Sequence, residues 1–262
     1  MTALPTDEAL KDARLHLQVD GAVATITLNK PEAKNSQTPT MWRALAAIGA
    51  ALPDDVRVVV LKGAGSCFSA GLDVSLLAPG GAAEESVADL LSADDQTVID
   101  TIGEYQQGFL WLRDPRFVTI AAVHSHAIGA GFQLALSCDL RVVADDVKFC
   151  MKEPALGLVP DLTGTQPLVE IVGYSMALDM CATARTIDAD EARTTGIANV
   201  VVPAAELDER VAALTDALLA TSVGAVRETK ALLVAASRRS LEEQSLAERT
   251  AQTRRFRELS GR

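Results

Sequence analysis

The chain has 262 residues, of which 48% are apolar and 23% charged, and its formal net charge is −11. This composition is that of an ordinary globular protein and excludes a chain that is disordered throughout. The negative charge argues against a nucleic-acid partner, because phosphate binding needs concentrated lysine and arginine. The sequence contains no apolar run of about 18 residues, as a membrane span requires, and no signal-peptide core. We therefore expect a cytoplasmic protein with no membrane span.

The cysteines and histidines do not suggest a metal site. The four cysteines lie far apart and include no CxxC pair, which predicts neither a disulfide framework nor a zinc site. His124 and His126 alternate on an extended segment and so point to the same side, but two histidines without a third ligand make no clear metal set. We expect no bound metal.

The first half of the chain alternates between strand and helix patterns. Residues 15–28 predict a β-hairpin around Asp20-Gly21, a turn dipeptide flanked by β-branched residues. Thr38 and Pro39 are typical of a helix start, and Trp42, Leu45, Ile48 and Leu52 follow at helical spacing. Residues 57–62 and 118–123 are apolar runs without clean alternation, as expected for strands covered on both faces. Residues 78–96 contain a Pro-Gly-Gly turn and several acidic residues, which predicts a mobile surface segment.

The second half continues the pattern and then becomes wholly helical. We predict strands at residues 140–144 and 198–202, and helices at residues 164–181 and 188–195. From Glu206 onward only helical patterns occur, at residues 207–237 and 241–259, which predicts two or three helices. Strand followed by helix, repeated, predicts an α/β fold with parallel pairing. We expect a core of residues 1–204 and a C-terminal helical region of residues 205–262.

Two glycine-rich segments follow predicted strands. The first, residues 63–73, would let a backbone approach a ligand closely at the carboxyl end of a strand. The second, residues 123–138, leads through Gly129-Ala130-Gly131 into an apolar helix, whose free N-terminal amides can stabilise an oxyanion. Either segment alone also fits a plain connecting turn or tight packing of a helix on a sheet.

Together with a third segment, these two resemble motifs of the enoyl-CoA hydratase/isomerase (crotonase) family. The first motif is Phe-Ser-Ala-Gly-Leu-Asp at residues 68–73, the second spans residues 120–141, and the third spans residues 152–166. The resemblance extends over about Leu15 to Leu233. It implies a crotonase-like spiral of ββα units, an acyl-CoA thioester substrate, and a homotrimer or a dimer of trimers. It implies no separate cofactor, because coenzyme A is part of the substrate.

The resemblance also assigns site residues by motif position. The backbone amides of Leu72 and Ala130 would form an oxyanion hole for the enolate oxygen of the transition state. Removing one such donor typically costs about 3–4 kcal/mol of transition-state stabilisation. Contacts with the substrate and its coenzyme A part are implied for six residues: Ala33, Lys34, Ala70, Gly71, Asp73 and Gly129.

The catalytic positions differ from those of a simple hydratase. Glu153 occupies one of the two positions at which the family's hydratases carry glutamates, but Gln133 occupies the other, and an amide is not a general base at neutral pH. Glu153 alone can move a proton between two carbons, as in the family's enoyl-CoA isomerases. Asp161 stands where the family's dienoyl-CoA isomerases carry a second carboxylate, although a loop or capping carboxylate is an equal reading. Gln133 could orient a water or the thioester.

From this resemblance we expect an enzyme that moves a double bond within an unsaturated fatty acyl-CoA through an oxyanion-stabilised enolate, in fatty-acid degradation. Two alternatives stay open. One is a 2-enoyl-CoA hydratase that uses one glutamate and a water held by Gln133. The other is a catalytically silent acyl-CoA binder, because a second glutamate is missing and family members usually continue with a further helix beyond the position of Arg262.

Overall fold

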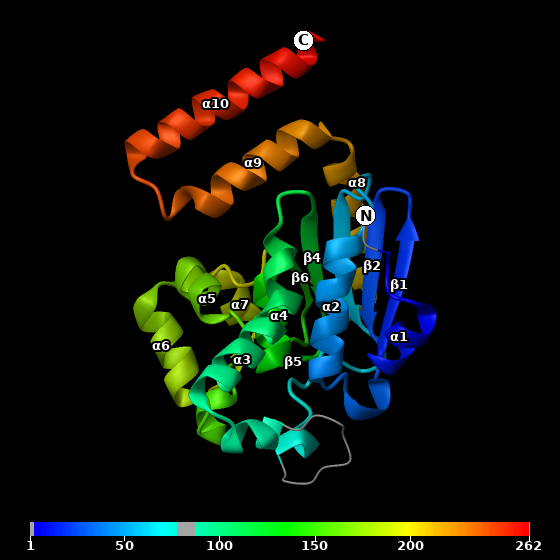
Figure 1. The fold of residues 1–262 in the computed structure, drawn as a ribbon, viewed down its shortest axis with the longest axis vertical. Coiled ribbons are helices and arrows are strands. Elements are labelled where there is room, and N and C mark those ends of the chain that lie inside the picture. Colours follow the sequence, from blue (N-terminus) through cyan, green and yellow to red (C-terminus); the bar gives the residue numbers. More distant parts are fainter. Residues whose placement is uncertain (1–2, 78–86, 262) are drawn as a thin grey trace.

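The computed structural model describes residues 3–77 and 87–261, which form a mixed α/β fold (Figure 1). In this part of the chain a six-stranded sheet has the order β1-β2-β3-β4-β6-β9, and a three-stranded sheet has the order β5-β7-β8. The strands are β1 (Leu15–Asp20), β2 (Val23–Leu28), β3 (Val58–Gly63), β4 (Val118–Val123), β5 (His126–Ile128), β6 (Leu140–Ala144), β7 (Lys148–Cys150), β8 (Ile187–Asp188) and β9 (Val200–Val202).

The helices connect these strands and cover both faces of the large sheet. Short 3-10 turns occur as well, among them the turn η5 at Glu153–Leu156. The α-helices are α1 (Asp7–Asp12), α2 (Pro39–Ala51), α3 (Asp95–Leu110), α4 (Ala130–Ser137), α5 (Thr165–Val172), α6 (Tyr174–Thr183), α7 (Ala189–Thr194), α8 (Leu207–Leu219), α9 (Val223–Ala236) and α10 (Leu241–Leu259).

The strand pairings confirm the predicted hairpin and parallel sheet. β1 and β2 pair antiparallel across the turn at Gly21, where φ is +52°. All other pairings in the large sheet are parallel, from β2 through β3, β4 and β6 to β9. Parallel neighbours need crossover connections, and the helices provide them. The short strands β5 and β7 form a second layer, so the chain passes from β4 into β5 and α4, and from β6 into β7 and η5.

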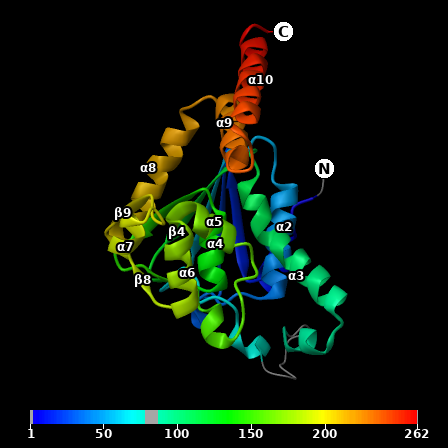
Figure 2. The same ribbon diagram turned by 90° about the vertical axis from the view of Figure 1, so that its left-hand side faces the viewer.

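Two apolar cores explain why the central strands lack alternation. Val59 and Leu61 of β3 pack into the larger core with α2, α3 and α4, whereas Val58 and Val60 pack into a second core with α8. Figure 2 shows α8 on one side of the sheet, with α2 and α3 on the other. A strand buried on both faces gains from apolar residues at every position.

Several predicted boundaries differ from the structure. The helix predicted at residues 164–181 is two helices, because Gly173 adopts φ +78° and ψ 163° between α5 and α6. The helical pattern after Glu206, for which two or three helices were predicted, forms the three helices α8, α9 and α10. Helix α3 was not predicted, and its start is fixed by the Asp94 side chain, which accepts from the amides of Gln96 and Thr97. Residues 78–86 of the predicted mobile segment lie outside the described residues.

The C-terminal helices differ in how they relate to the sheet. Helix α8 packs on β3, β4 and β6, while α9 and α10 form a hairpin that extends from the body (Figure 1). Among the described residues, no helix is both long and apolar enough to cross a bilayer. The division of the chain into residues 1–204 and residues 205–262 stays a prediction.

Candidate active site

Two glycine-containing segments, far apart in sequence, meet at the carboxyl ends of β3 and β4. The Ser69 amide donates to the His126 carbonyl (2.9 Å), and the Ile128 amide donates to the Ser69 carbonyl (3.0 Å). The Phe68 amide donates to the His124 carbonyl in the same manner (3.0 Å). The first predicted motif is thereby joined, as an added strand, to β5 and the start of the second motif.

Gly71 allows the closest approach between these segments. Its φ is +89°, and a Cβ atom added there would lie 2.4 Å from the Ile128 carbonyl oxygen and 3.5 Å from the Ala130 nitrogen. No other residue fits such a position without displacing backbone. Gly71 therefore brings the Leu72 amide close to the Ala130 amide at the N-terminus of α4.

The amides of Leu72 and Ala130 are free to bind a ligand. Within residues 3–77 and 87–261, neither amide donates a hydrogen bond to another protein group. Gly129, which precedes Ala130 at the start of α4, has φ +51°, a conformation that favours glycine. Two unpaired amides, one of them at a helix N-terminus, are the donors that an oxyanion requires.

A loop after β2 supports the first segment. The Ala70 amide donates to the Lys34 carbonyl (2.8 Å), and the Gln37 amide donates to the Gly71 carbonyl (2.7 Å). Asn35, which is fully buried, donates from its side chain to the carbonyls of Ala64 and Cys67. Sequence reasoning did not identify Asn35, although its φ of +52° is a conformation that asparagine tolerates better than most residues.

The predicted coenzyme A residues lie along this loop and the first motif. Ala33 is half-buried and the Lys34 side chain is exposed. The Asp73 carboxylate is bonded to Lys30 Nζ (2.6 Å), and to Ser36 and Ser75, which holds the pKa of Asp73 well below its usual range. The ammonium of Lys30 is the largest cause, and this ion pair was not predicted from the sequence.

Glu153 lies beside Gly129, at the start of η5. A Cβ atom added at Gly129 would lie 3.1 Å from Glu153 Oε1, so the carboxylate contacts the residue before Ala130. Oε1 accepts a hydrogen bond from Gln133, whereas the buried Oε2 has no partner among the described residues. Burial raises the pKa of Glu153. A carboxylate with one unpaired, desolvated oxygen is a strong candidate for proton transfer.

Gln133 is buried in α4 and contacts three parts of the site. Its Nε2 donates to Glu153 Oε1 (2.7 Å), and its Oε1 accepts from the amides of Leu162 (2.9 Å) and Gly164 (3.2 Å). The oxygen of the Gln133 side chain therefore accepts two backbone amides, and one N–H of its NH₂ group donates to Glu153. That Gln133 could orient a water or the thioester stays a prediction.

Asp161 lies near Glu153, on the loop that Gln133 contacts. It is half-buried, burial raises its pKa, and its charge contributes to the raised pKa of Glu153. Gln106 of α3 donates to the Asp161 carbonyl (2.7 Å). The structure thus brings together two carboxyl groups that both favour the protonated form more than an exposed carboxyl group does.

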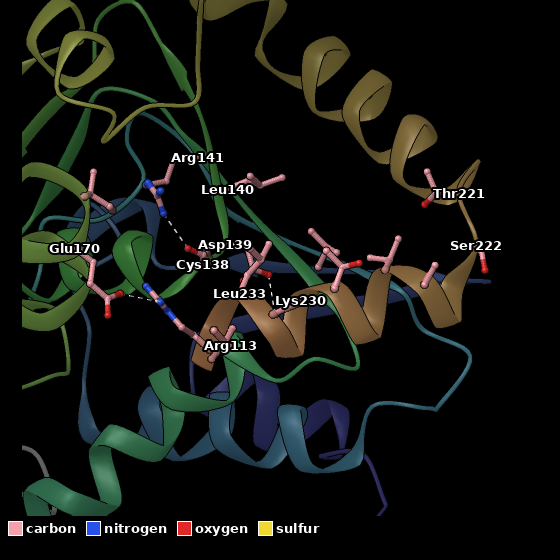
Figure 3. A pocket seen from close by; sticks show the side chains of 16 residues that line it. Arg113, Cys138, Asp139, Leu140, Arg141, Glu170, Thr221, Ser222, Lys230 and Leu233 are labelled. Atoms are coloured by element: carbon pink, nitrogen blue, oxygen red, sulfur yellow. Dashed lines mark hydrogen bonds and ion pairs between the residues drawn. The ribbon is translucent and has the colours of Figure 1, made fainter. Parts of the chain in front are cut away.

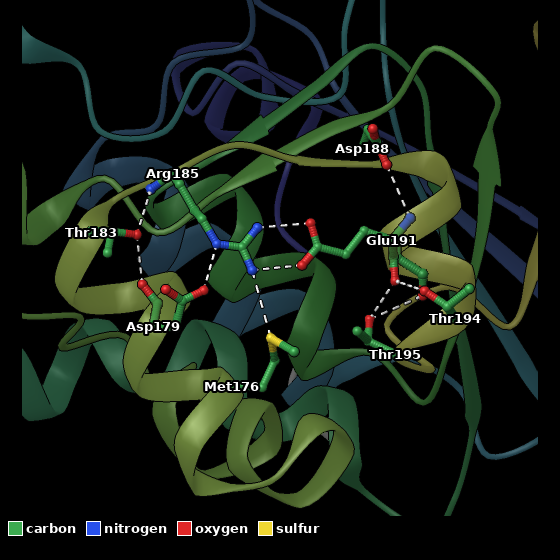
Figure 4. Close-up of polar contacts among 9 residues, drawn as sticks. Met176, Asp179, Thr183, Arg185, Asp188, Glu191, Thr194 and Thr195 are labelled. Atoms are coloured by element: carbon green, nitrogen blue, oxygen red, sulfur yellow. Dashed lines mark hydrogen bonds and ion pairs between the residues drawn. The ribbon is translucent and has the colours of Figure 1, made fainter.

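Helix α6 packs against η5, the turn that begins at Glu153. Arg185 links α6 to α7 (Figure 4). Arg185 donates to Asp179 of α6 (2.6 Å) and to both carboxylate oxygens of Glu191 in α7 (2.7 and 2.6 Å). Burial raises the pKa of Cys181 in α6, and the charge of Glu153 adds to this effect. Neither Arg185 nor Cys181 was identified from the sequence as part of the site.

The two histidines make separate contacts. His124 Nε2 lies 3.0 Å from the Gly65 carbonyl oxygen, and His126 Nδ1 lies 2.7 Å from Ser125 Oγ. Among the described residues, no group of three or more histidine, cysteine, aspartate and glutamate side chains could hold a metal ion.

A large cavity of about 540 Å³ lies elsewhere, between α9 and the carboxyl end of α4 (Figure 3). Its floor holds a buried ion pair between Lys230 Nζ and Asp139 Oδ2 (2.7 Å). Burial lowers the pKa of Lys230. Arg141 donates to the carbonyls of Ala135 and Cys138 at the end of α4. The cavity and the two free amides therefore lie at opposite ends of one helix.

Comparison with known proteins assigns the chain to a family. The sequence profile of the enoyl-CoA hydratase/isomerase family matches residues 18–262. The chain belongs to the enoyl-CoA hydratase/isomerase family. The protein named "Probable enoyl-CoA hydratase echA8" from Mycobacterium bovis is 33% identical over 232 residues, which cover 88% of this chain and 84% of that protein.

Further relatives in the family carry different names. The peroxisomal Delta(3,5)-Delta(2,4)-dienoyl-CoA isomerase of Arabidopsis thaliana is 31% identical and covers 86% of this chain and 81% of its own length. A crystal structure of a candidate enoyl-CoA hydratase from Thermobifida fusca YX in complex with CoA superposes with a TM-score of 0.94, at 51% identity, over 100% of both chains. The predicted crotonase-like fold is confirmed, and the family contains both hydratases and isomerases.

Proposed function

We propose that this family member is an acyl-CoA isomerase that moves a double bond of an unsaturated fatty acyl-CoA, with Glu153 as the proton carrier. One observation carries the proposal. The buried Oε2 of Glu153 has no partner among the described residues, and Glu153 contacts the residue that precedes a free α4 amide. The solved relative in complex with CoA supports an acyl-CoA ligand. No separate cofactor is needed in this reaction, because coenzyme A enters with the substrate.

The reaction follows from this arrangement. The thioester oxygen accepts hydrogen bonds from the amides of Leu72 and Ala130, which makes the C2 proton of a 3-enoyl-CoA more acidic. Glu153 takes that proton, and the electron pair of the C–H bond moves through C2 and C1 to the oxygen as an enolate. Glu153 then gives the proton to C4 while the enolate re-forms the carbonyl. The double bond moves from C3 to C2, and no atom is gained or lost.

Asp161 extends the proposal to a dienoyl substrate. With a 3,5-dienoyl-CoA, a second carboxyl group near Glu153 can exchange a proton with a carbon farther along the acyl chain. Burial raises the pKa of Asp161, which supports this role, because a carboxyl group that is protonated more readily can give a proton as well as take one.

Hydration of a 2-enoyl-CoA is the second candidate, and the names of the relatives favour it. Hydration needs a group that activates a water as well as a group that protonates carbon. Gln133 stands at the second glutamate position and its amide is bonded to Glu153, Leu162 and Gly164. We therefore rank isomerisation above hydration.

The test compares turnover of 3-enoyl-CoA, 3,5-dienoyl-CoA and 2-enoyl-CoA by the wild type and by Glu153→Gln. We expect a conjugated product of unchanged mass from one of the first two substrates, and loss of at least a hundredfold in kcat in the variant. Glu209→Gln, an exposed carboxylate on α8, is the matched control and should retain wild-type kcat. A gain of one water from 2-enoyl-CoA without isomerisation would favour hydration, and binding without turnover would favour the silent binder.

The oligomeric state and location are also proposals. Large apolar side chains of the α9–α10 hairpin are exposed, among them Leu233 (69%), Leu246 (57%) and Phe256 (63%). Exposed apolar surface of this kind marks an interaction site, which supports the proposed homotrimer or dimer of trimers. A cytoplasmic location stays a prediction from the sequence.

A further inference from the structure

We propose that Gln133 is a positioning residue that makes Oε2 the proton-carrying oxygen of Glu153 and holds the Asp161 loop beside it. This inference deepens the proposed function and rests on it. It assigns to the amide at the second glutamate position a role in isomerisation, in place of a role in holding water.

The orientation of the Gln133 amide is determined by its neighbours. The amides of Leu162 and Gly164 can only donate, and both point at Gln133 Oε1, at 2.9 and 3.2 Å. If the side-chain amide were flipped, its NH₂ group would face two backbone N–H groups. All of these are donors, so no hydrogen bond could form. The NH₂ group must therefore face Glu153, where it donates to Oε1 at 2.7 Å.

The side chain also has no room to turn away. Gln133 is fully buried, and a Cβ atom added at Gly164 would lie 2.6 Å from Gln133 Cγ. A side chain at position 164 would therefore collide with the Gln133 side chain. The Ser137 hydroxyl donates to the Gln133 carbonyl (2.9 Å), which adds a further contact within α4.

This contact distinguishes the two oxygens of Glu153. Oε1 accepts from the Gln133 NH₂ group and is kept in an acceptor role, whereas Oε2 is buried without a partner among the described residues. Oε2 is then the oxygen that takes the substrate proton and returns it. Gln133 Oε1 also accepts hydrogen bonds from the backbone amides of Leu162 and Gly164. These two bonds hold the loop that carries Asp161.

The test measures the titration of Glu153 itself, without relying on turnover. Carboxyl ¹³C NMR of glutamate-labelled protein, assigned through the signal lost in Glu153→Gln, gives the Glu153 pKa in wild type, Gln133→Met and the control Gln166→Met. Gln166 is exposed and contacts Glu170 and Arg238, away from the site. A hydrogen bond from Gln133 stabilises the charged carboxylate, so Gln133→Met should raise the Glu153 pKa by about one unit or more, and Gln166→Met should not.

A second apolar variant repeats the test without adding a charge. Gln133→Leu removes the donor to Glu153 and, unlike a carboxylate, does not itself shift the pKa of Glu153 by repulsion. The acidic side of the pH profile of kcat for isomerisation should move to higher pH in Gln133→Leu and in Gln133→Met, by about one unit or more, because the ionised form of Glu153 abstracts the proton. If Gln133→Met does not fold, the pH profile of Gln133→Leu decides the question.

Unchanged titration of Glu153 in Gln133→Met, or an unchanged pH profile of kcat in Gln133→Leu, would overturn the positioning role. Failure of the proposed function looks different. In that case the wild type would not isomerise any acyl-CoA, while the NMR titration of Glu153 would still report whether Gln133 acts on it.

Discussion

At the scale of single residues, the site places a carboxylate where its charge is costly. Glu153 is desolvated, its Oε2 has no partner among the described residues, and burial raises its pKa. Active sites tolerate this loss of folding stability where the chemistry requires a carboxyl group that readily gains and loses a proton. The loss should appear as a dependence of folding stability on pH.

We predict that Glu153→Gln is more thermostable than wild type at pH 8, by a few degrees in Tm. The folded-state pKa of Glu153 lies above its unfolded value, so its contribution to stability is present below the unfolded pKa and is lost as pH rises through the folded pKa. The gain should therefore shrink toward about pH 4, near the usual glutamate pKa. Thermal unfolding at both pH values measures it, and equal Tm values at pH 8 would contradict the prediction.

The sequence was informative about some of these residues and not about others. Glu153, Leu72 and Ala130 stand at motif positions, so the resemblance could assign them before any geometry was available. The ion pair of Lys30 with Asp73 joins residues 43 positions apart, and the Gln133 contacts join residues up to 31 positions apart. Contacts of this kind depend on how loops meet in space, and local patterns do not report them.

At the scale of elements, helix α4 links the site to the C-terminal helices. Its N-terminus carries the free Ala130 amide. At its carboxyl end, the side chains of Arg113 and Arg141 donate hydrogen bonds to backbone carbonyls. Cationic groups at a helix C-terminus stabilise the helix through its dipole. Asp139, two residues beyond α4, then joins this end to Lys230 of α9.

We predict that Lys230→Met destabilises the protein by about 3–5 kcal/mol, because it leaves the Asp139 charge largely buried without its cation. The two side chains are only 8% and 19% exposed. The double variant with Asp139→Asn should recover part of the loss, since Thr119 can still donate to an amide oxygen. Denaturant unfolding measures each free energy, with the exposed Lys11→Met as control. A Lys230→Met variant as stable as its control would contradict the role of this pair.

Element boundaries could be predicted where turn and cap signals were strong. The hairpin at Asp20-Gly21 and the helix start at Thr38 were correct because those signals are local. The break at Gly173 was missed because an apolar period continued through it, and α3 was missed because the cap at Asp94 was included in a segment predicted to be mobile. The three short strands of the small sheet have only two or three residues each, too few for a periodic pattern.

At the scale of the whole molecule, the α9–α10 hairpin leaves apolar surface uncovered. Helix α10 carries exposed Leu241, Leu246, Phe256 and Leu259. The parallel sheet and its covering helices could be predicted from the order of strands and helices. The way that α10 lies along α9 could not, because the apolar residues of α10 do not by themselves indicate which of them face another part of the chain.

We predict that the purified protein has a solution mass of three or six times 27.6 kDa, and that Phe256→Glu lowers it toward that of a single chain. A buried charge in an apolar interface costs more than the contact contributes. Ala9→Glu, at an exposed position of α1, adds the same charge away from the α9–α10 hairpin and should keep the oligomer. Light scattering after size exclusion gives the masses, and a monomeric wild type would contradict the proposed assembly.

The central claim is that one carboxylate carries a proton between two carbons without adding water. The most direct test incubates 3-enoyl-CoA with the protein in D₂O and measures product mass and deuterium content by mass spectrometry. Because Glu153 Oε2 is buried, we predict a 2-enoyl-CoA product that mostly retains the substrate's own proton. A product that has gained D₂O, or a 2-enoyl-CoA product that carries one deuterium in nearly every molecule, would contradict proton transfer by a shielded Glu153.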